Sequence, residues 1–146
     1  MSSAVAMENT CSALVGIPFK DGGRNPNDGF DCWGLVSFVY ALRGRPVEDY
    51  IISATESALI DGIISTAATS KWVRVGMGEL KEMDVLTFRL DPQHPNFVTH
   101  CGVYTGNGRF LHSLQKIGVN VSRLDDLYWK ARFAGAYRRS ADAAGI

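Results

Sequence analysis

The sequence lacks an excess of charge of either sign. Its 146 residues carry 15 lysines and arginines against 15 aspartates and glutamates. No basic stripe marks a nucleic-acid surface, and no arginine-rich face marks an anionic membrane as a partner. No apolar run approaches the roughly 18 residues that cross a bilayer. We therefore expect neither nucleic acid nor a membrane among the partners.

Cysteine is scarce, and its count is odd. The three cysteines are Cys11, Cys32 and Cys101. An odd count without a secretion signal favours reduced thiols over a disulfide scaffold, and residues 1–8 lack the positive leader and long apolar core of a signal peptide. We expect Cys11 and Cys101 to be small packed residues.

Metal-binding spacings, repeats and long linkers are missing as well. No CxxC or HExxH motif occurs, so a zinc site made of Cys32, His100 and His112 is kept only as an alternative, and we expect no cofactor. A hydrophobic content of 46% is enough for a core. We expect the whole chain to be one domain, with a core over about 10–139 and a tail over 140–146.

The chain does have two successive patterns of secondary structure. Apolar residues at helical spacing predict helices in the first half, and from Asp84 onward β-branched and aromatic residues predict strands. This order indicates an α+β fold, with a central antiparallel sheet of about five strands packed against helices. Residues 72–75 form a short strand or an extended link. The expected helices span 7–15, 32–43 and 56–68, the expected strands span 85–88, 99–105, 109–114, 119–121 and 135–138, and turn-rich loops span 20–29 and 91–97.

Cys32 is the first residue of the helix expected over 32–43. We expect Asp31 to cap this helix by accepting a backbone amide of the first turn, and Gly44 to end it. The positive end of a helix dipole makes a thiol easier to ionise, and the thiolate is the nucleophilic form. Cys32 is therefore a candidate nucleophile, although a cysteine at a helix start is more often a packed residue. Asp31 receives no catalytic role.

Two histidines flank the turn sequence Gly-Asn-Gly at 106–108. A two-residue turn would put His100 and His112 on opposite faces of the hairpin. A three-residue loop would put His112 opposite Gly102 and make the two rings diagonal neighbours, with Cβ atoms roughly 7 Å apart or less. The sequence permits either register, and the catalytic interpretation needs the one in which the rings meet.

Cys32, His100 and His112 together are the parts of a thiol hydrolase. We expect His100 to form an ion pair with the thiol and later to protonate the leaving amine. His112 would fix the ring and the tautomer of His100, and the backbone amide of Cys32 would help to stabilise an oxyanion. A strand histidine is more often structural, and we expect His94 to be solvated.

Three stretches of the sequence resemble the NlpC family of bacterial cell-wall cysteine peptidases, within the papain-like superfamily. They are Gly29 to Val36 around the cysteine, Met83 to Phe88, and His100 to His112 on the hairpin, within a likeness that runs from about Leu14 to Arg139. The cysteine block and the hairpin block together are specific. The resemblance implies a papain-like fold with the nucleophile at the N-terminus of the central helix.

By motif position, the resemblance identifies Cys32 as the nucleophile, His100 as the base and His112 as the third polar residue. It implies hydrolysis of peptidoglycan stem peptides, typically at the γ-D-glutamyl–diaminopimelate bond. Trp33, the Val39-Tyr40 that follows and the closing Tyr-Arg-Arg at 137–139 look most like the branch found in phage and prophage tails. This implies a protein made in the bacterial cytoplasm without a signal peptide, carried to the cell wall on the virion tail with other tail proteins as partners.

Two other functions and two departures from the family pattern accompany this interpretation. A structural tail-tip component would keep the fold without cleaving, and a thiol amidase or acyltransferase would use the same cysteine. Many family members have a tyrosine in place of Phe19, and its phenol assists the oxyanion site. Met83-Asp84 stands where the family has Gly-Asp, which we interpret as an adjusted turn. Residues 46–80 match the family least, and we expect them to shape the specificity groove.

Overall fold

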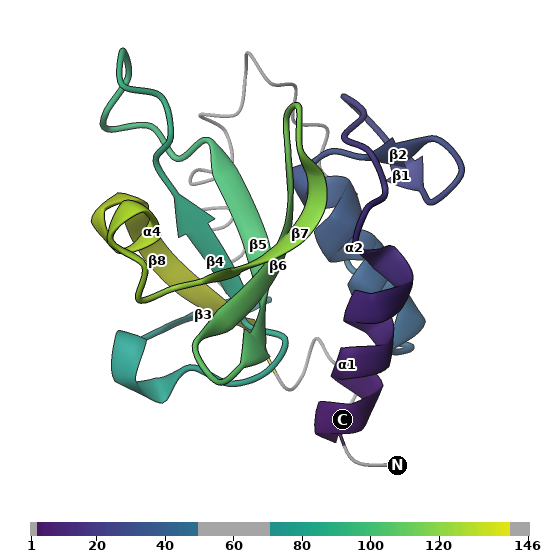
Figure 1. Ribbon diagram of the computed structural model, residues 1–146. Helices are drawn as coiled ribbons and strands as arrows, with labels where there is room; N and C mark the ends of the chain where they lie inside the picture. The colour runs from purple at the N-terminus through teal and green to yellow at the C-terminus, as the bar shows by residue number, and fades with distance from the viewer. Residues whose placement is uncertain (1–2, 50–70, 141–146) are drawn as a thin grey trace.

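The computed structural model describes residues 3–49 and 71–140, and these ranges contain three α-helices and a twisted sheet (Figure 1). The helix expected over 56–68, and the expected tail apart from its first residue, lie outside the described residues. The helices are α1 (Ser3–Leu14), α2 (Cys32–Leu42) and α4 (Leu127–Arg132), and a 3-10 turn, η1, spans Met77–Glu79.

Six antiparallel strands form the main sheet, in the order β3-β8-β4-β5-β6-β7. All five expected strands are present, and the sixth is the segment that the sequence left open as a strand or a link. The α+β class, with a central antiparallel sheet packed against helices, is thereby confirmed. The strands are β3 (Trp72–Val75), β4 (Val85–Phe88), β5 (His100–Gly106), β6 (Arg109–Leu114), β7 (Gly118–Arg123) and β8 (Phe133–Arg139).

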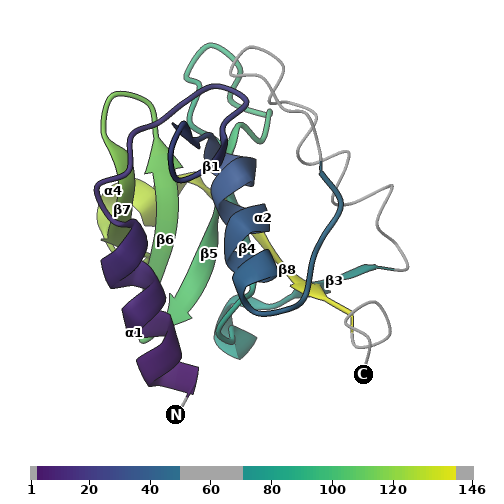
Figure 2. The same cartoon turned by 90° about the vertical axis from the view of Figure 1, so that its right-hand side faces the viewer.

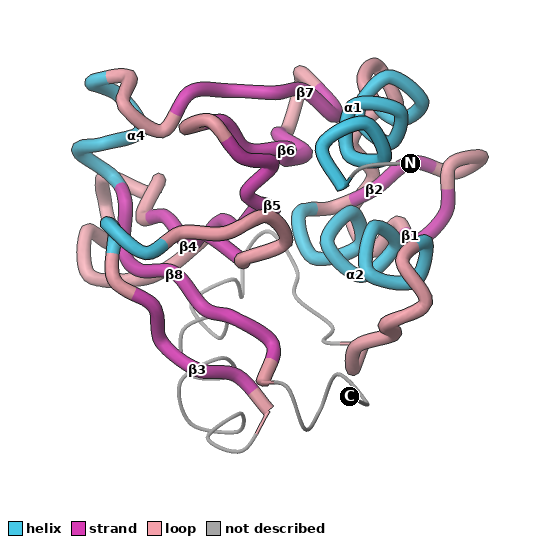
Figure 3. The backbone as a smooth tube through the Cα atoms, turned by 90° about the horizontal axis from the view of Figure 1, so that it is seen from below, coloured by secondary structure: helices cyan, strands magenta, loops and turns pink. Residues whose placement is uncertain are grey.

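The sheet is covered on both faces. Helices α1 and α2 lie side by side against one face, and α4 lies on the other side (Figures 2 and 3). Val39 of α2 belongs to one buried cluster, whereas Trp129 of α4 packs with Phe88 and Phe110 in a second cluster. Because both faces are covered, β4 is buried at all four of its positions. This explains why apolar residues alternate only partly along that strand.

Helix α2 begins and ends close to where the sequence predicted. Asp31 accepts a hydrogen bond from the backbone nitrogen of Gly34 at 2.6 Å, which satisfies one of the free N–H groups of the first turn. Gly44 has a left-handed φ of +70° just after the helix, as expected of a glycine that ends a helix. Helix α1 begins at Ser3, four residues before the expected start at residue 7.

Two parts of the fold were not predicted. The loop expected over 20–29 contains a small hairpin of β1 (Arg24–Asn25) and β2 (Gly29–Phe30). Helix α4 went unrecognised because its six residues include only one buried side chain, that of Trp129. A helical period cannot be read from so short a segment.

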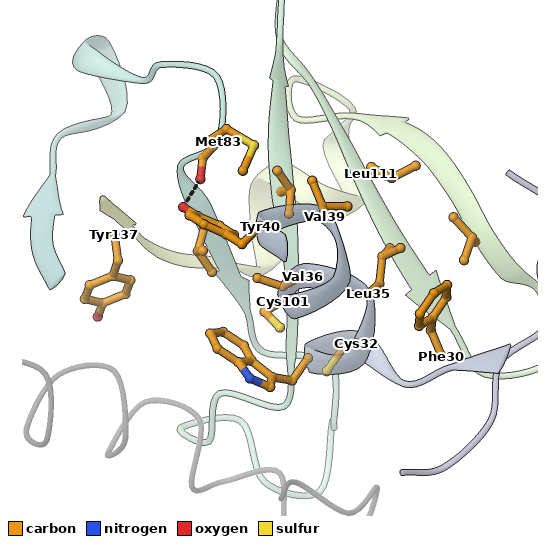
Figure 4. Close-up of a cluster of buried hydrophobic side chains, with 14 of the residues drawn as sticks. Phe30, Cys32, Leu35, Val36, Val39, Tyr40, Met83, Cys101, Leu111 and Tyr137 are labelled. Carbon is orange, nitrogen blue, oxygen red and sulfur yellow. Dashed lines mark hydrogen bonds between the residues drawn. The ribbon is translucent and has the colours of Figure 1, made fainter. Parts of the chain in front are cut away.

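Met83 takes a left-handed conformation directly before β4, with a φ of +81°. That conformation favours glycine, which is the residue that the family has at this position. The Met83 side chain is nevertheless buried, and its carbonyl accepts a hydrogen bond from the hydroxyl of Tyr40 on α2 (Figure 4). Met83 thus takes this backbone conformation without being a glycine.

Asp84 forms an ion pair that links the start of β4 to β8. The Nε and Nη2 atoms of Arg138 each lie 2.9 Å from a carboxylate oxygen of Asp84, and the backbone nitrogen of Lys81 donates to the same carboxylate at 2.8 Å. The Asp84 side chain is 1% exposed and that of Arg138 is 35% exposed. Loss of this carboxylate would remove the acceptor of three hydrogen bonds.

We expect Asp84→Ala to lower the free energy of unfolding by about 2–3 kcal/mol, since one charge of a largely buried pair loses its partner. Asp125→Ala is the matched control, because Asp125 pairs with Arg123 at 3.0 Å on the exposed surface. Urea unfolding measures both variants. An Asp84→Ala midpoint equal to that of Asp125→Ala would show that the buried pair adds nothing.

Candidate active site

A pocket of about 310 Å³ opens where the N-terminus of α2 meets the start of β5. Cys32 and His100 both line it, so the structure brings the first two predicted site residues to one cavity. His112 does not line the pocket and lies behind His100. No hydrogen bond joins the Cys32 sulfur to the His100 ring in the part of the chain that the structure describes. The lining residues are Phe19, Asp21, Asp31, Cys32, Leu90, Asp91, Thr99, His100, Ser113, Leu114 and Gln115.

The carboxylate of Asp31 holds the wall of this pocket together. In addition to capping α2, it accepts from the backbone nitrogen of Gly22 at 3.1 Å and from Arg24 Nη1 at 2.7 Å. Arg24 in turn contacts Asp49 at 2.7 Å. Asp31 is 3% exposed, and all its described bonds serve the local structure. Its predicted role as a helix cap, without a catalytic task, agrees with this geometry.

Glycines allow the loop before α2 to pack directly on the first turn of the helix. A Cβ atom on Gly34 would lie 1.9 Å from the carbonyl oxygen of Gly23, and a Cβ atom on Gly23 would lie 2.2 Å from the carbonyl oxygen of Gly29. Both separations are far shorter than any real contact of a Cβ atom. Side chains at these positions would push the loop away from the helix start that carries Cys32.

Cys32 is accessible from the pocket, and Cys101 lies beside it in the core (Figure 4). The interaction with the Cys32 side chain, together with complete burial, raises the pKa of the Cys101 thiol well above its ordinary value. Cys101 therefore stays protonated and can donate to the Cys32 sulfur. Cys101 is packed as predicted, but its position beside the candidate nucleophile could not be predicted from the sequence.

The two histidine rings meet, because His100 Nε2 lies 2.8 Å from His112 Nδ1. The register that produces this contact does not come from the expected three-residue loop. The turn pairs Gly106 with Arg109, as a two-residue turn does, and a bulge between Tyr104 and Gly106 then shifts the pairing by one residue. A bulge adds one unpaired residue to one strand, so both histidines end on the same face.

The small residue opposite His112 also matters for this contact. A Cβ atom on Gly102 would lie only 3.0 Å from the Cβ atom of His112 and 2.8 Å from the carbonyl oxygen of Leu111. The absence of a side chain at Gly102 therefore leaves room for His112 on the neighbouring strand.

Aromatic side chains bury the histidine pair from the side of α4. The Trp129 ring stands at 90° to His112 at 4.8 Å between centroids and lies 5.9 Å from His100. Burial lowers the pKa of His100 well below its usual value, with the neighbouring His112 as the smaller cause. Burial likewise lowers the pKa of His112 to about 3. Both rings are therefore neutral at neutral pH.

Sequence reasoning missed three residues around this pair. Trp129 covers the rings, Ser122 Oγ lies 2.8 Å from His112 Nε2, and Asn120 faces His112 across the β6–β7 ladder. Asn120 and Ser122 alternate with Val119 and Val121, a strand period that places both polar residues on one face. That alternation was the available signal, but the register that brings it to His112 was not evident from the sequence.

Other expectations concern metal, membrane and the third histidine. Within 3–49 and 71–140, no group of three or more histidine, cysteine, aspartate or glutamate side chains is arranged to hold a metal ion. None of the described helices is both long and apolar enough to cross a membrane. His94 is exposed, as predicted, with its ring stacked on Phe97 and its Nδ1 atom 2.8 Å from Asp91.

The low pKa of His112 predicts how stability depends on pH. Above pH 6.5 the ring is neutral in the folded and unfolded chains, and between pH 6.5 and about 3 only the unfolded chain gains a proton. As the pH is lowered through this range, the free energy of unfolding should therefore decrease by up to about 1.4 kcal/mol per pH unit because of this ring. Measured by urea unfolding between pH 7 and 5, the free energy of unfolding of His112→Gln should depend less steeply on pH than that of the parent protein.

His94→Gln is the control for this slope, because His94 lies on the surface. It should keep the pH dependence of the parent protein. A His112→Gln variant with the parent slope would contradict a buried, neutral His112.

Comparison with known proteins identifies the family. The sequence profile of the NlpC/P60 family matches residues 16–138. The chain is 30% identical over 128 residues to the gamma-DL-glutamyl hydrolase of Bacillus subtilis (strain 168), covering 85% of this chain and 26% of that protein. It is 32% identical over 139 residues to the murein DD-endopeptidase MepH of Escherichia coli (strain K12), covering 94% and 46%.

Solved structures agree with this match. The crystal structure of an NlpC/P60 family protein from Bacillus cereus ATCC 10987 superposes with a TM-score of 0.68 at 26% identity, covering 93% of this chain and 40% of that one. The chain thus spans between a quarter and a half of the length of these relatives. With a family profile matched along most of its length and the same papain-like fold, this chain belongs to the NlpC/P60 family.

Proposed function

We propose that the chain is a cysteine endopeptidase that hydrolyses the stem peptides of peptidoglycan. The observation that carries the proposal is the pocket that Cys32 and His100 share, with His112 bonded to the far side of the His100 ring. In this proposal Cys32 is the nucleophile, His100 the base and His112 the residue that orients it. Both relatives named above carry hydrolase or endopeptidase names, which supports the same reaction class.

The proposed reaction begins with proton transfer from Cys32 to His100. A neutral imidazole can accept that proton, and burial keeps His100 neutral. The Cys32 sulfur then attacks the carbonyl carbon of the scissile bond and forms a tetrahedral oxyanion. Collapse of this intermediate breaks the C–N bond, and His100 passes its proton to the departing amine. A water molecule, activated by the same ring, hydrolyses the thioester and frees Cys32.

Stabilisation of the oxyanion falls to the backbone in this proposal. The first N–H groups of an α-helix have no partner within the helix, and Cys32 is the first residue of α2. These amides and the helix dipole favour a negative charge beside the sulfur. Phe19 lines the pocket but has no hydroxyl to add, so the phenol of other family members has no equivalent at this position.

For the cleaved bond, we propose the γ-D-glutamyl–diaminopimelate linkage. The name of the Bacillus subtilis relative refers to a glutamyl bond, whereas that of the Escherichia coli relative refers to a DD bond. The family resemblance favours the former. Mass analysis of the fragments released from whole peptidoglycan distinguishes this bond from the DD bond and from the products of an amidase or acyltransferase.

We further propose that the protein acts from a phage or prophage tail, with other tail proteins as partners. The support is the likeness of Trp33 and of residues 137–139 to that branch of the family. Trp33 is fully buried, and its indole nitrogen donates to the carbonyl of Glu48 at 3.1 Å.

A structural tail component without activity is the second candidate function. The specific observation in its favour is the missing hydroxyl at Phe19. The following experiment separates it from the peptidase.

Cys32→Ala should lower the release of fragments from purified sacculi by about 1,000-fold or more, because the nucleophile is lost. Cys11→Ala is the matched control, since Cys11 is a half-buried residue of α1 and does not line the pocket. It should cleave like the parent protein. Chromatography with mass analysis measures the products. Undiminished cleavage by Cys32→Ala would refute the mechanism, and no cleavage by the parent protein would favour the structural role.

A further inference from the structure

A row of hydrogen bonds continues behind His112 and ends on the backbone. His112 Nε2 lies 2.8 Å from Ser122 Oγ, and Ser122 Oγ donates to Asn120 Oδ1 at 3.1 Å. The amide nitrogen of Asn120 donates to the carbonyl of Gly118 at 3.0 Å. Together with the His100–His112 contact, these groups form one connected row from the pocket to β7.

The end of the row fixes the direction of every bond in it. The carbonyl of Gly118 can only accept, so the Asn120 amide must present its NH₂ group there and its oxygen to Ser122. Because that oxygen also only accepts, the Ser122 hydroxyl must use its hydrogen on Asn120. Ser122 is then left with a lone pair toward His112, so His112 must carry its proton on Nε2.

The same reasoning extends to His100. A neutral His112 with a proton on Nε2 has an unprotonated Nδ1 atom, which can only accept. His100 must therefore donate from Nε2, and a neutral His100 then has its free lone pair on Nδ1. Nδ1 is the ring atom left to accept a proton from the pocket side. Each step follows from the number of donors and acceptors along the row.

We propose that Ser122 and Asn120 are positioning residues that select the tautomer of His100 in which Nδ1 is the base. The inference rests on the proposed function of Cys32 and His100, and it assigns a task to two residues outside the predicted site. Neither residue lies in the core, since Asn120 and Ser122 are both only partly buried. Their substitution can therefore be tested without opening a large cavity.

Loss of the Ser122 hydroxyl would remove one of the two side-chain acceptors that hold the proton of His112 on Nε2, the other being Asn120. His112 could then carry its proton on Nδ1 and donate it to His100 Nε2. That reversal would put the proton of His100 on Nδ1, where the ring cannot accept a proton from the thiol. The tautomer of the histidine base matters for catalysis in the serine triad, and here a partial shift between the two tautomers is expected to lower kcat.

The test reads the tautomers directly by NMR of protein labelled with ¹⁵N in histidine. Only three histidines are present, so His94→Gln and His112→Gln assign the signals. In the parent protein we expect Nε2 to be protonated in both His100 and His112. In Ser122→Ala we expect a proton signal to appear on Nδ1 of both His112 and His100. Ser122→Thr, which keeps the hydroxyl, should retain the parent pattern.

Activity on a soluble stem peptide gives the second readout. Ser122→Ala and Asn120→Ala should lower kcat by roughly three- to tenfold, the size of effect of one lost hydrogen bond, with KM unchanged. Ser122→Thr should recover most of the loss. Thr105→Ala is the control, because it likewise removes a strand hydroxyl that donates a hydrogen bond. The acceptor of the Thr105 hydroxyl is the carbonyl of Arg109, and this bond lies on the exposed hairpin.

The outcomes separate this inference from the proposed function. A proton on His100 Nδ1 in the parent protein, or parent tautomers and parent kcat in Ser122→Ala, would overturn the positioning role. If instead the parent protein shows the expected tautomers but Cys32→Ala cleaves as well as the parent, the proposed function fails while the proton order stands.

Discussion

The carboxylate of Asp31 connects the three segments on which the pocket depends. It bonds to the first turn of α2, to the glycine loop through Gly22, and to Arg24 of the small hairpin. Because these segments are fixed against one another, the first residue of α2 has one position relative to β5. A buried carboxylate is stable only when its acceptor sites are filled, and in Asp31 three donors fill them. The position of Cys32 follows from this cluster.

On the other side of the pocket, burial and hydrogen bonding together determine the protonation of His100 and His112. Aromatic rings remove His100 and His112 from water, which keeps both imidazoles neutral. A neutral imidazole pair has donors and acceptors in only two possible orders, so the hydrogen bonds behind it decide which order is present. The same burial that costs stability at low pH thus leaves the ring with an unprotonated nitrogen. In the proposed reaction, a positive charge appears on the His100 ring only after it has accepted the thiol proton.

Much of the fold was predictable because local chemistry determines it. The Asp31 cap, the Gly44 stop and five strands follow from short-range patterns, and the histidine pair follows from family resemblance. The sequence could not reveal how the two rings come together. A bulge between Tyr104 and Gly106 sets the register of the hairpin, and no residue pattern in the sequence marks the bulge. The roles of Trp129 and Ser122 depend on contacts between distant segments, and the six residues of α4 carry no readable period.

The central claim is that the Cys32 sulfur and the His100 ring act on each other across the pocket. The rate at which iodoacetamide alkylates Cys32 between pH 6 and 8 tests this most directly, with the modified residue identified by mass spectrometry. The account predicts alkylation in the parent protein that slows by about tenfold or more in His100→Ala, since the base that accepts the thiol proton is gone. Equal rates in the two proteins, or a Cys32 that resists alkylation in both, would contradict it.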